Sequence, residues 1–252
     1  MCYYNGIRVS KAEYIRLKEI EKELSHLNSL RKLASGFDFS DWPIIKPANN
    51  GQDFTVQDAH WEFIPAWIKN SSELAITRKK FTTLNATAEK LLESKMYRNS
   101  ALNRRCLVLS SGFFEWRHFR PDNAKKDLTY PYFIDIPAHP VFFMAGIWQP
   151  WTDQDTGETF DTFAIVTTKA NDLMEQVHNT KKRMPTILPD HLAWEWIQPK
   201  LSEEQILSIA SYQYCSEEMT AHTISKDFRE QFKLMEKDPT DEYEYDELPP
   251  LL

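Results

Sequence analysis

The second residue of the chain, Cys2, follows the initiating Met1. Methionine is commonly removed when a small residue follows it, and Cys2 would then carry a free α-amine beside its thiol. The amine titrates near about pH 8, against roughly 10.4 for a lysine, so part of it is nucleophilic at neutral pH. The thiol is a strong nucleophile once ionised. Such a pair can capture an aldehyde as an imine and then as a thiazolidine, although a cysteine at a terminus is by itself most often unreactive.

Three other polar residues are candidates for acid–base or positioning roles. Glu115 lies in the aromatic run FFEW, where burial would raise the pKa of a carboxyl; the alternative is a glutamate that faces water on an edge strand. His178 precedes a basic loop, residues 181–183, whose cations suit a phosphate-bearing partner, although a single histidine is more often structural. Asn85 is, by its local sequence, an N-cap or turn residue.

Two tryptophans, Trp61 and Trp67, lie in the aromatic run HWEFIPAWI. Core packing is the ordinary explanation for such a cluster. Aromatic rings beside a groove could also stack on unpaired bases. The sequence leaves both readings open.

The composition restricts the class of protein and the partners. The 252 residues are 42% hydrophobic, enough for a sizeable core, and the three cysteines form no metal or disulfide spacing, so we expect a cytoplasmic protein without a metal or cofactor. No leader or spanning run is present, so no membrane partner is expected. From residue 236 onward, seven acids against one lysine supply −6 of the net charge of −7. The near-neutral remainder can still carry a basic groove for nucleic acid.

The first third of the chain predicts mainly helix and loop. A capping box of Ser10 and Glu13, followed by an apolar stripe, predicts a helix over residues 10–33. Residues 37–58 are rich in Pro, Asn, Asp and Gly, which predicts a long loop with at most one short strand. A short helix is expected over residues 84–92.

Strands predominate afterwards. Apolar, β-branched and aromatic runs bounded by turn residues predict strands at residues 104–116 (broken near 111), 130–136, 140–148, 162–168 and 219–225, with helices at 169–179, 191–197 and 202–210. We therefore expect an α+β fold: one domain over residues 1–230, with a mixed or antiparallel, partly barrel-like β-sheet core flanked by helices. Residues 231–252 are expected to be an acidic, disordered tail.

Taken in order, these segments resemble a known family. MC, WEFIPAW, NATAE, GFFEW, FFMAGIW, FAIVTTKAN, HNTKKRMPTIL and AHTIS are similar to the motifs of SRAP-domain proteins, the SOS-response-associated peptidase family, whose members shield abasic sites in single-stranded DNA. The resemblance implies that Cys2 crosslinks the ring-opened sugar of an abasic site. It further implies that Glu115 shuttles protons, His178 assists ring opening and Asn85 holds the attacking groups.

The resemblance also implies a DNA-contacting set, with some departures. The family commonly has arginine where this chain has Thr87, and many members begin MCGR where Tyr3 and Tyr4 follow Cys2 here. The resemblance therefore supports the crosslinking chemistry better than it supports the individual DNA contacts. The residues expected to contact DNA are Arg98, Trp116, Thr167, Lys182, Arg183, Trp61 and Trp67.

Two alternatives remain open beside covalent capture of abasic sites. A cysteine peptidase or autopeptidase would use Cys2 as the nucleophile with Glu115 and His178, although only Met1 precedes the cysteine. A non-covalent single-strand binder would use the tryptophans and the basic loop. In each case we expect a monomer, and a DNA lyase side activity is compatible with the first reading.

Overall fold

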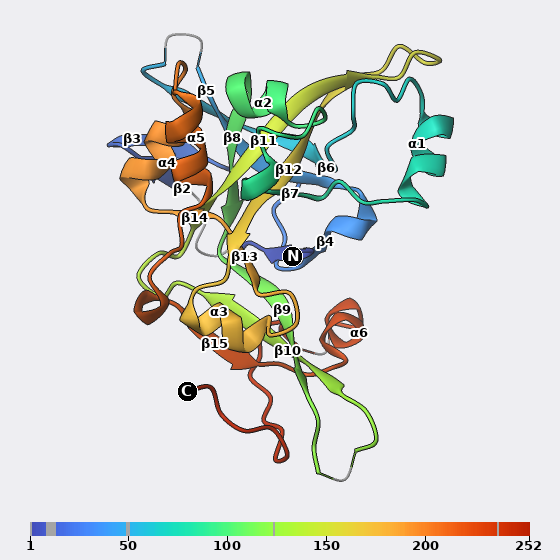
Figure 1. Ribbon diagram of the computed structural model, residues 1–252, viewed down its shortest axis with the longest axis vertical. Helices are drawn as coiled ribbons and strands as arrows, with labels where there is room; N and C mark the ends of the chain where they lie inside the picture. Colours follow the sequence, from blue (N-terminus) through green and yellow to red (C-terminus); the bar gives the residue numbers. More distant parts are fainter. Residues whose placement is uncertain (1, 9–13, 49–50, 123, 236) are drawn as a thin grey trace.

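Two strands that follow each other almost without a break along the chain connect the two halves of the molecule. The computed structural model describes residues 2–8, 14–48, 51–122, 124–235 and 237–252. Strands β8 (Arg105–Ser110) and β9 (Gly112–Phe119) are separated only by Ser111, and β8 lies in an upper barrel while β9 lies in a lower sheet (Figure 1). Glycine is required at position 112, because a Cβ there would lie 2.1 Å from Cζ of Phe133.

The barrel is a closed ring of five strands. Neighbours in the ring are antiparallel, except that β6 and β12 run parallel. In order around the ring the strands are β12 (Thr159–Lys169), β6 (Phe54–Trp61), β5 (Asp41–Pro47), β8 and β11 (Phe142–Thr152). Three short strands extend it: β7 (Asn85–Thr87) and β13 (Arg183–Pro185) pair with β12, and β14 (Ile187–Leu188) pairs with β11.

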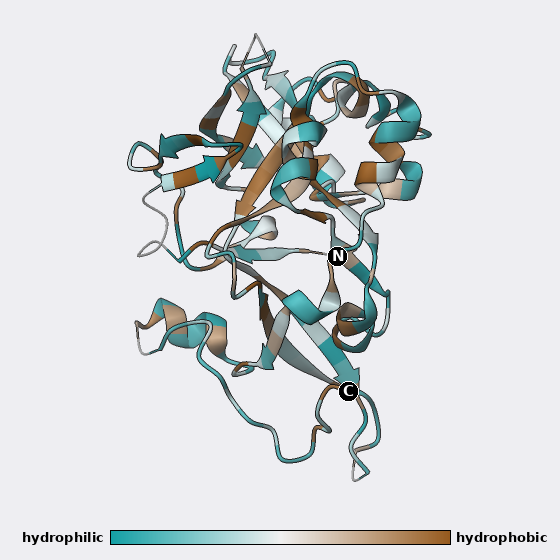
Figure 2. Ribbon diagram, turned by 90° about the vertical axis from the view of Figure 1, so that its left-hand side faces the viewer, coloured by the Kyte–Doolittle hydropathy of each residue, from teal (hydrophilic) through white to brown (hydrophobic). Residues whose placement is uncertain are grey.

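The main hydrophobic core fills the barrel and its covering layer. Residues 163–168 of β12 are all buried, as are all six residues of β8, because helices and loops cover the outer face of these strands. This explains why both strands are apolar without alternation. Figure 2 shows the hydrophobic colouring concentrated on the barrel strands.

The lower sheet has five antiparallel strands. In order they are β15 (Thr220–Thr223), β10 (Leu128–Asp135), β9, β1 (Tyr4–Gly6) and β4 (Ala34–Ser35). A separate hydrophobic cluster of Phe114, Phe133, Ile224 and Phe228 packs on it. The N-terminal strand β1 lies between β9 and β4 in this sheet.

Short helices flank the two sheets. They are α1 (Ser71–Arg78), α2 (Arg98–Asn103), α3 (Asp172–Val177), α4 (Asp190–Ile197), α5 (Glu203–Ala210) and α6 (Phe228–Lys233), with 3₁₀ turns at Gly36–Asp38, Ala88–Lys90 and Ser216–Glu218. Helix α3 contacts β9 and β13, and so connects the two sheets. Among the described residues, no helix has the length and apolar character needed to cross a membrane.

The predicted fold class is confirmed. The structure is α+β, with a mixed sheet that closes into a barrel and helices on its outside. The strands predicted across residues 104–116, 130–136, 140–148 and 162–168 are present, as are the helices that became α3, α4 and α5. These segments have strong local patterns that the tertiary structure does not override.

The helix predicted over residues 10–33 is wrong. Ser10 and Glu13 lie outside the described residues, but residues 14–23 form a hairpin of β2 (Tyr14–Leu17) and β3 (Ile20–Glu23). Lys18 and Glu19 between them have φ of 47° and 63°, two consecutive left-handed residues that a right-handed helix does not contain. The buried Ile15 and Leu17 fit a period of two as well as a helical stripe.

Two further predictions for the first third are wrong. Residues 37–58, predicted as a loop, contain most of the antiparallel pair β5 and β6, whose prolines obscured the strand pattern. The helix predicted over residues 84–92 is strand β7 followed by a 3₁₀ turn. Asn85 is therefore a strand residue and not an N-cap, because pairing with Ile165 on β12 holds its backbone extended.

The acidic C-terminal segment packs on the lower sheet. Tyr130 Oη donates to Glu247 Oε1 (2.9 Å), Arg117 Nη1 donates to Pro249 O (2.6 Å), and Tyr245 Oη donates to Ile224 O (2.8 Å). The expectation that residues 231–252 are disordered rests on composition alone, and composition does not predict these contacts. The domain boundary at residue 230 stays a prediction.

Candidate active site

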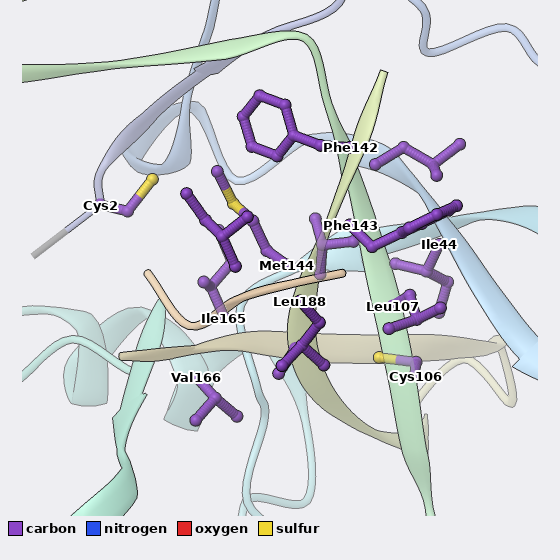
Figure 3. Packing of buried hydrophobic residues seen from close by; sticks show 14 of the residues in the cluster. Cys2, Ile44, Cys106, Leu107, Phe142, Phe143, Met144, Ile165, Val166 and Leu188 are labelled. Carbon is purple, nitrogen blue, oxygen red and sulfur yellow. The ribbon is translucent and has the colours of Figure 1, made fainter. Parts of the chain in front are cut away.

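Cys2 is positioned by the anchoring of β1 at the junction between the sheets. Asn5 Nδ2 donates to Leu109 O (3.2 Å), and Asn5 Oδ1 accepts from Ser110 Oγ (2.6 Å). The Cys2 side chain is fully buried, and its Sγ donates to Tyr4 O at 3.7 Å. Figure 3 shows it pointing toward Met144 and Ile165 at the edge of the barrel core.

The environment of Cys2 keeps its thiol protonated. Burial raises the pKa of the Cys2 thiol, and the nearby charge of Glu115 raises it further. Glu115 also contributes to the raised pKa of Tyr3, after burial of that side chain. Glu115 directly follows Phe114 of β9, which pairs with Tyr4 of β1. The thiol therefore needs a proton acceptor before it can act as a thiolate.

Glu115 is a buried carboxyl on β9, opposite Tyr132 of β10. Its side chain is 4% exposed, and its Oε2 lies 3.9 Å from Nε2 of His178. Burial raises the pKa of Glu115 to about 7. A pKa raised toward neutrality suits a group that both gives and takes protons. The alternative of a glutamate facing water on an edge strand is wrong.

His178 is the C-terminal cap residue of α3, and its ring is oriented by a main-chain bond. Asn171 caps the start of this helix by accepting from Met174 N (2.9 Å). Nδ1 of His178 lies 2.8 Å from Arg183 O, and because a carbonyl only accepts, Nδ1 carries the proton and Nε2 faces Glu115 with its lone pair. Burial lowers the pKa of His178 to about 4, so the ring is neutral at pH 7.

Asn85 is placed on β7, which borders the same barrel strand as the basic loop. It pairs with Ile165, two residues before Thr167 on β12, and Thr167 contacts Arg183. Both polar atoms of the Asn85 amide are buried, and neither has a hydrogen-bond partner among the described residues. An unsatisfied buried amide is unfavourable in an ordinary core, so this group is a candidate to bind a ligand.

The cations expected to contact DNA are all engaged with carboxylates. Arg183 Nη1 lies 2.6 Å from Glu89 Oε1, and Arg183 Nη2 donates to Thr167 O (2.6 Å). Lys182 Nζ lies 3.2 Å from a carboxylate oxygen of Glu175, and Arg98 Nη2 lies 2.5 Å from one of Glu203. The structure thus brings Arg183 and Thr167 together near His178, whereas Arg98 is joined to α5. The roles of these residues stay predictions.

The three tryptophans differ in exposure. Trp61 is 1% exposed, stacks on Phe163 and donates to Leu84 O (3.2 Å), so the expected contact with DNA is wrong for this residue and the core-packing alternative is correct. Trp67 is 56% exposed, which leaves its ring available. Trp116, beside Glu115, is half-buried, and its ring meets that of Tyr4 edge to face at 5.1 Å.

Two residues near the site were not anticipated from the sequence. Glu89 neutralises Arg183 across 94 positions of sequence, and Tyr97 donates to Asn85 O (3.4 Å), with burial raising the pKa of Tyr97 to about 12. Glu89 lies within the NATAE segment, but no local pattern predicts its contact with Arg183 or that of Tyr97 with Asn85, because both depend on the closure of the barrel. Within the described part of the chain, no group of three or more His, Cys, Asp or Glu side chains could hold a metal ion.

Comparisons with known proteins identify the relatives of this fold and site. The family model described as SOS response associated peptidase (SRAP) matches residues 11–230. "Abasic site processing protein YoqW" of Bacillus subtilis is 29% identical over 182 residues, covering 72% of this chain and 75% of that protein. "Abasic site processing protein YMR114C" of Saccharomyces cerevisiae is 29% identical over 177 residues, covering 68% and 44%.

A solved structure agrees with these relatives. A crystal structure of a Bacteroides thetaiotaomicron protein superposes with a TM-score of 0.74 at 33% identity, over 95% of this chain and 97% of that one. The fold, the order of motifs and the match over residues 11–230 agree. The chain belongs to the SOS response associated peptidase (SRAP) family.

Proposed function

We propose that this protein processes abasic sites in single-stranded DNA by forming a covalent crosslink through Cys2 after removal of Met1. The observation that carries the proposal is the buried group of Cys2, Glu115 and His178, in which Glu115 Oε2 lies 3.9 Å from His178 Nε2 and influences the titration of the Cys2 thiol. The relatives named abasic site processing proteins supply the substrate class.

The first steps require proton transfer at a sugar. The cyclic form of an abasic deoxyribose must open, which moves the proton of its C1 hydroxyl away and delivers one to the ring oxygen, leaving an aldehyde. A neutral imidazole and a carboxyl with a pKa of about 7 suit this exchange near neutral pH. The Cys2 amine then attacks the aldehyde carbon, and protonated Glu115 assists departure of the hydroxyl as water to give an imine.

Ring closure completes the crosslink. The Cys2 sulfur adds to the imine carbon, the C=N double bond becomes a single bond, and the thiol proton is transferred, through Glu115, to the nitrogen. The net reaction joins one aldehyde and one aminothiol with loss of one water, and no oxidant is needed. The protonated state of the buried thiol fits this order, because the sulfur acts second and delivers its proton within the site.

Asn85 is proposed to hold the reacting groups in line. Its amide offers one acceptor and two donor hydrogens in a buried position without a partner among the described residues. A deoxyribose hydroxyl or the imine nitrogen would satisfy it. The expected result of losing Asn85 is slower crosslinking rather than loss of the fold.

A denaturing gel with a single-stranded oligonucleotide that carries one abasic site tests the proposal. Wild type should give a shifted adduct, Cys2→Ala should give none, and Cys2→Ser should give at most a reversible imine. Cys215→Ala is the matched control, because that thiol is exposed and outside the site, and it should crosslink like wild type. An undiminished adduct from Cys2→Ala would contradict the proposal.

The family description as a peptidase makes bond cleavage ahead of Cys2 the second candidate. In that case Cys2 would attack a carbonyl with Glu115 and His178 assisting. The raised pKa of the thiol argues against a preformed thiolate and so against efficient turnover of external peptides. Release of peptides in trans that is lost in Glu115→Ala would favour this candidate over DNA capture.

A further inference from the structure

We propose that a cavity beside Arg105, at the start of β8, binds a small phosphate monoester. The cavity has a volume of about 770 Å³, which is within the range of small-molecule sites. Lys46, Trp148 and Lys200 line it together with Arg105. None of these residues belongs to the group assigned to the abasic site, so the inference goes beyond the proposed function. We call this site the barrel-end cavity.

The barrel-end cavity and the junction that holds Cys2 lie at opposite ends of β8. Arg105 is the first residue of this strand and pairs with Ile147 of β11. Ser110 is its last residue and donates to Asn5 of β1. Six residues of extended strand span roughly 17 Å. A small molecule in the barrel-end cavity would therefore not contact Cys2.

The cationic side chains of the cavity are not balanced by acids. None of its described lining residues is acidic. Lys46 Nζ lies 2.6 Å from Asp161 Oδ2, so its charge is matched. Arg105 uses four of its five N–H groups on main-chain carbonyls, and no described carboxylate lies within ion-pair distance of it. Lys200 is exposed and has no ion pair with a described carboxylate. Two unmatched positive charges remain, which suits a dianion.

Two buried neutral donors at the cavity also lack acceptors. Trp148 Nε1 and Gln198 Nε2 have no hydrogen-bond partner among the described residues. Trp148 lines the cavity, and Gln198 lies between the lining residues Ile197 and Pro199. A buried donor without an acceptor is unfavourable. Because these unmatched groups are all donors, the ligand they favour is negatively charged and rich in acceptor oxygens.

A phosphate monoester fits the cavity better than a carboxylate or inorganic phosphate does. A phosphate group carries a charge of about −1.5 to −2 near pH 7 and offers three acceptor oxygens, whereas a carboxylate carries a single charge. Leu102, Ile197 and Leu201 add apolar surface to the lining, which would cover an apolar or aromatic body attached to the phosphate. Inorganic phosphate has no such body and would leave this surface in water.

Equilibrium dialysis with phenyl phosphate tests the inference. Wild type should bind phenyl phosphate at least about 10-fold more tightly than inorganic phosphate, which lacks the ring, and than benzoate, which has the ring but a single charge. Benzoate that binds as tightly as phenyl phosphate would show a carboxylate site and overturn the assignment. A Kd for phenyl phosphate above about 10 mM would also overturn it.

Two variants locate the ligand in the cavity. Lys200→Ala should raise the Kd for phenyl phosphate roughly 5- to 10-fold, and Trp148→Phe, which keeps a ring but removes the N–H donor, should raise it about 3-fold. Arg105 is not replaced, because it also holds four carbonyls and its loss would affect folding. Lys80→Ala is the matched control, because Lys80 is exposed and does not line the cavity, and it should change Kd less than about 2-fold.

The same measurement separates this site from the abasic-site chemistry. Cys2→Ala should bind phenyl phosphate with the wild-type Kd, because Cys2 lies beyond the other end of β8. Loss of binding in Cys2→Ala would overturn the inference, as would an unchanged Kd in both Lys200→Ala and Trp148→Phe. Failure of the crosslinking proposal would produce neither result, so the two failures are distinguishable.

Discussion

The end of the barrel at Arg105 and the junction site at Glu115 bury ionisable groups in opposite ways. Arg105 is 4% exposed, and burial lowers its pKa only to about 10, so it remains charged. Its guanidinium donates to the main-chain carbonyls of Ala101, Leu102, Trp196 and Gln198. Glu115 is equally buried but faces a neutral imidazole and a thiol, and its pKa reaches about 7.

This difference indicates a structural role for Arg105 and a proton-transfer role for Glu115. The Arg105 charge is matched by acceptors from two segments, α2 and the end of α4, and so joins both to β8. The carboxyl of Glu115 is held where neither protonation state is strongly favoured at pH 7, which reduces stability but allows proton exchange. The two regions should therefore respond to mutation in opposite directions.

The largest expected change is the loss of stability in Arg105→Ala. Four carbonyls would lose their donor inside the protein, so the free energy of unfolding should fall by roughly 3–5 kcal/mol. Urea denaturation followed by circular dichroism measures it. Arg104→Ala is the control, because Arg104 is only partly buried and bonds Trp148 O and Ser100 Oγ, and it should lose about 1 kcal/mol. Equal losses would contradict the structural role of Arg105.

Glu115→Gln should slow crosslinking while stabilising the fold. Removal of the proton-transferring carboxyl should reduce the rate about 100-fold. At pH 8 the same variant should be more stable than wild type by on the order of 2–3 kcal/mol, because a buried carboxylate is replaced by a neutral amide. Rates from quenched gels and thermal unfolding measure the two effects. A variant that loses both rate and stability would indicate a structural carboxyl.

The pH dependence of stability should reveal opposing contributions from Glu115 and His178. The contribution of Glu115 is present below its unfolded pKa and is lost as the pH rises through about 7. That of His178 is present above its unfolded pKa and is lost as the pH falls through about 4. Between pH 7 and 5 they oppose each other in wild type.

Each single variant should expose the other group in that pH range. Glu115→Gln should lose stability between pH 7 and 5, by roughly 1–2 kcal/mol, whereas His178→Gln should gain a similar amount. Unfolding in urea at three pH values measures these slopes. Parallel slopes in the two variants would show that the buried pair does not control the titration.

The smallest expected change separates two asparagines. Asn70 caps α1 by accepting from Glu73 N (2.9 Å), so Asn70→Ala should lose about 1 kcal/mol. Asn85→Ala removes an amide without a hydrogen-bond partner among the described residues and should change stability by less than about 0.5 kcal/mol. Only Asn85→Ala should slow crosslinking. Equal rates for the two variants would remove Asn85 from the site.

The parts of the fold that the sequence predicted correctly are those with a strong local sequence pattern. β8, β9 and β12 were predicted because continuous apolar residues 4–8 long occur there between turn signals. The hairpin at residues 14–23 was missed because its apolar residues satisfy two periodicities, and only the positive φ of Lys18 and Glu19 decides between them. The prolines of β5 likewise hid a strand that two neighbours stabilise.

The residue pattern alone predicted less of the site than of the fold. The aromatic run around Glu115 left a buried carboxyl and a water-facing glutamate both open, and the structure shows the carboxyl buried. His178 lies beside Glu115 although it comes 63 positions later in the sequence. This contact depends on the packing of α3 against β9, which no local sequence pattern predicts. The sequence could not decide the position of Trp61, because an aromatic residue in a core and one in a binding groove have the same sequence pattern.

The central claim is that the α-amine and thiol of Cys2 together form the bond to DNA. Protease digestion of the purified adduct, followed by mass spectrometry, tests it most directly. The account predicts an N-terminal peptide that begins at Cys2 and carries the abasic sugar with loss of one water. A crosslink on a lysine, or an adducted peptide that retains Met1, would contradict it.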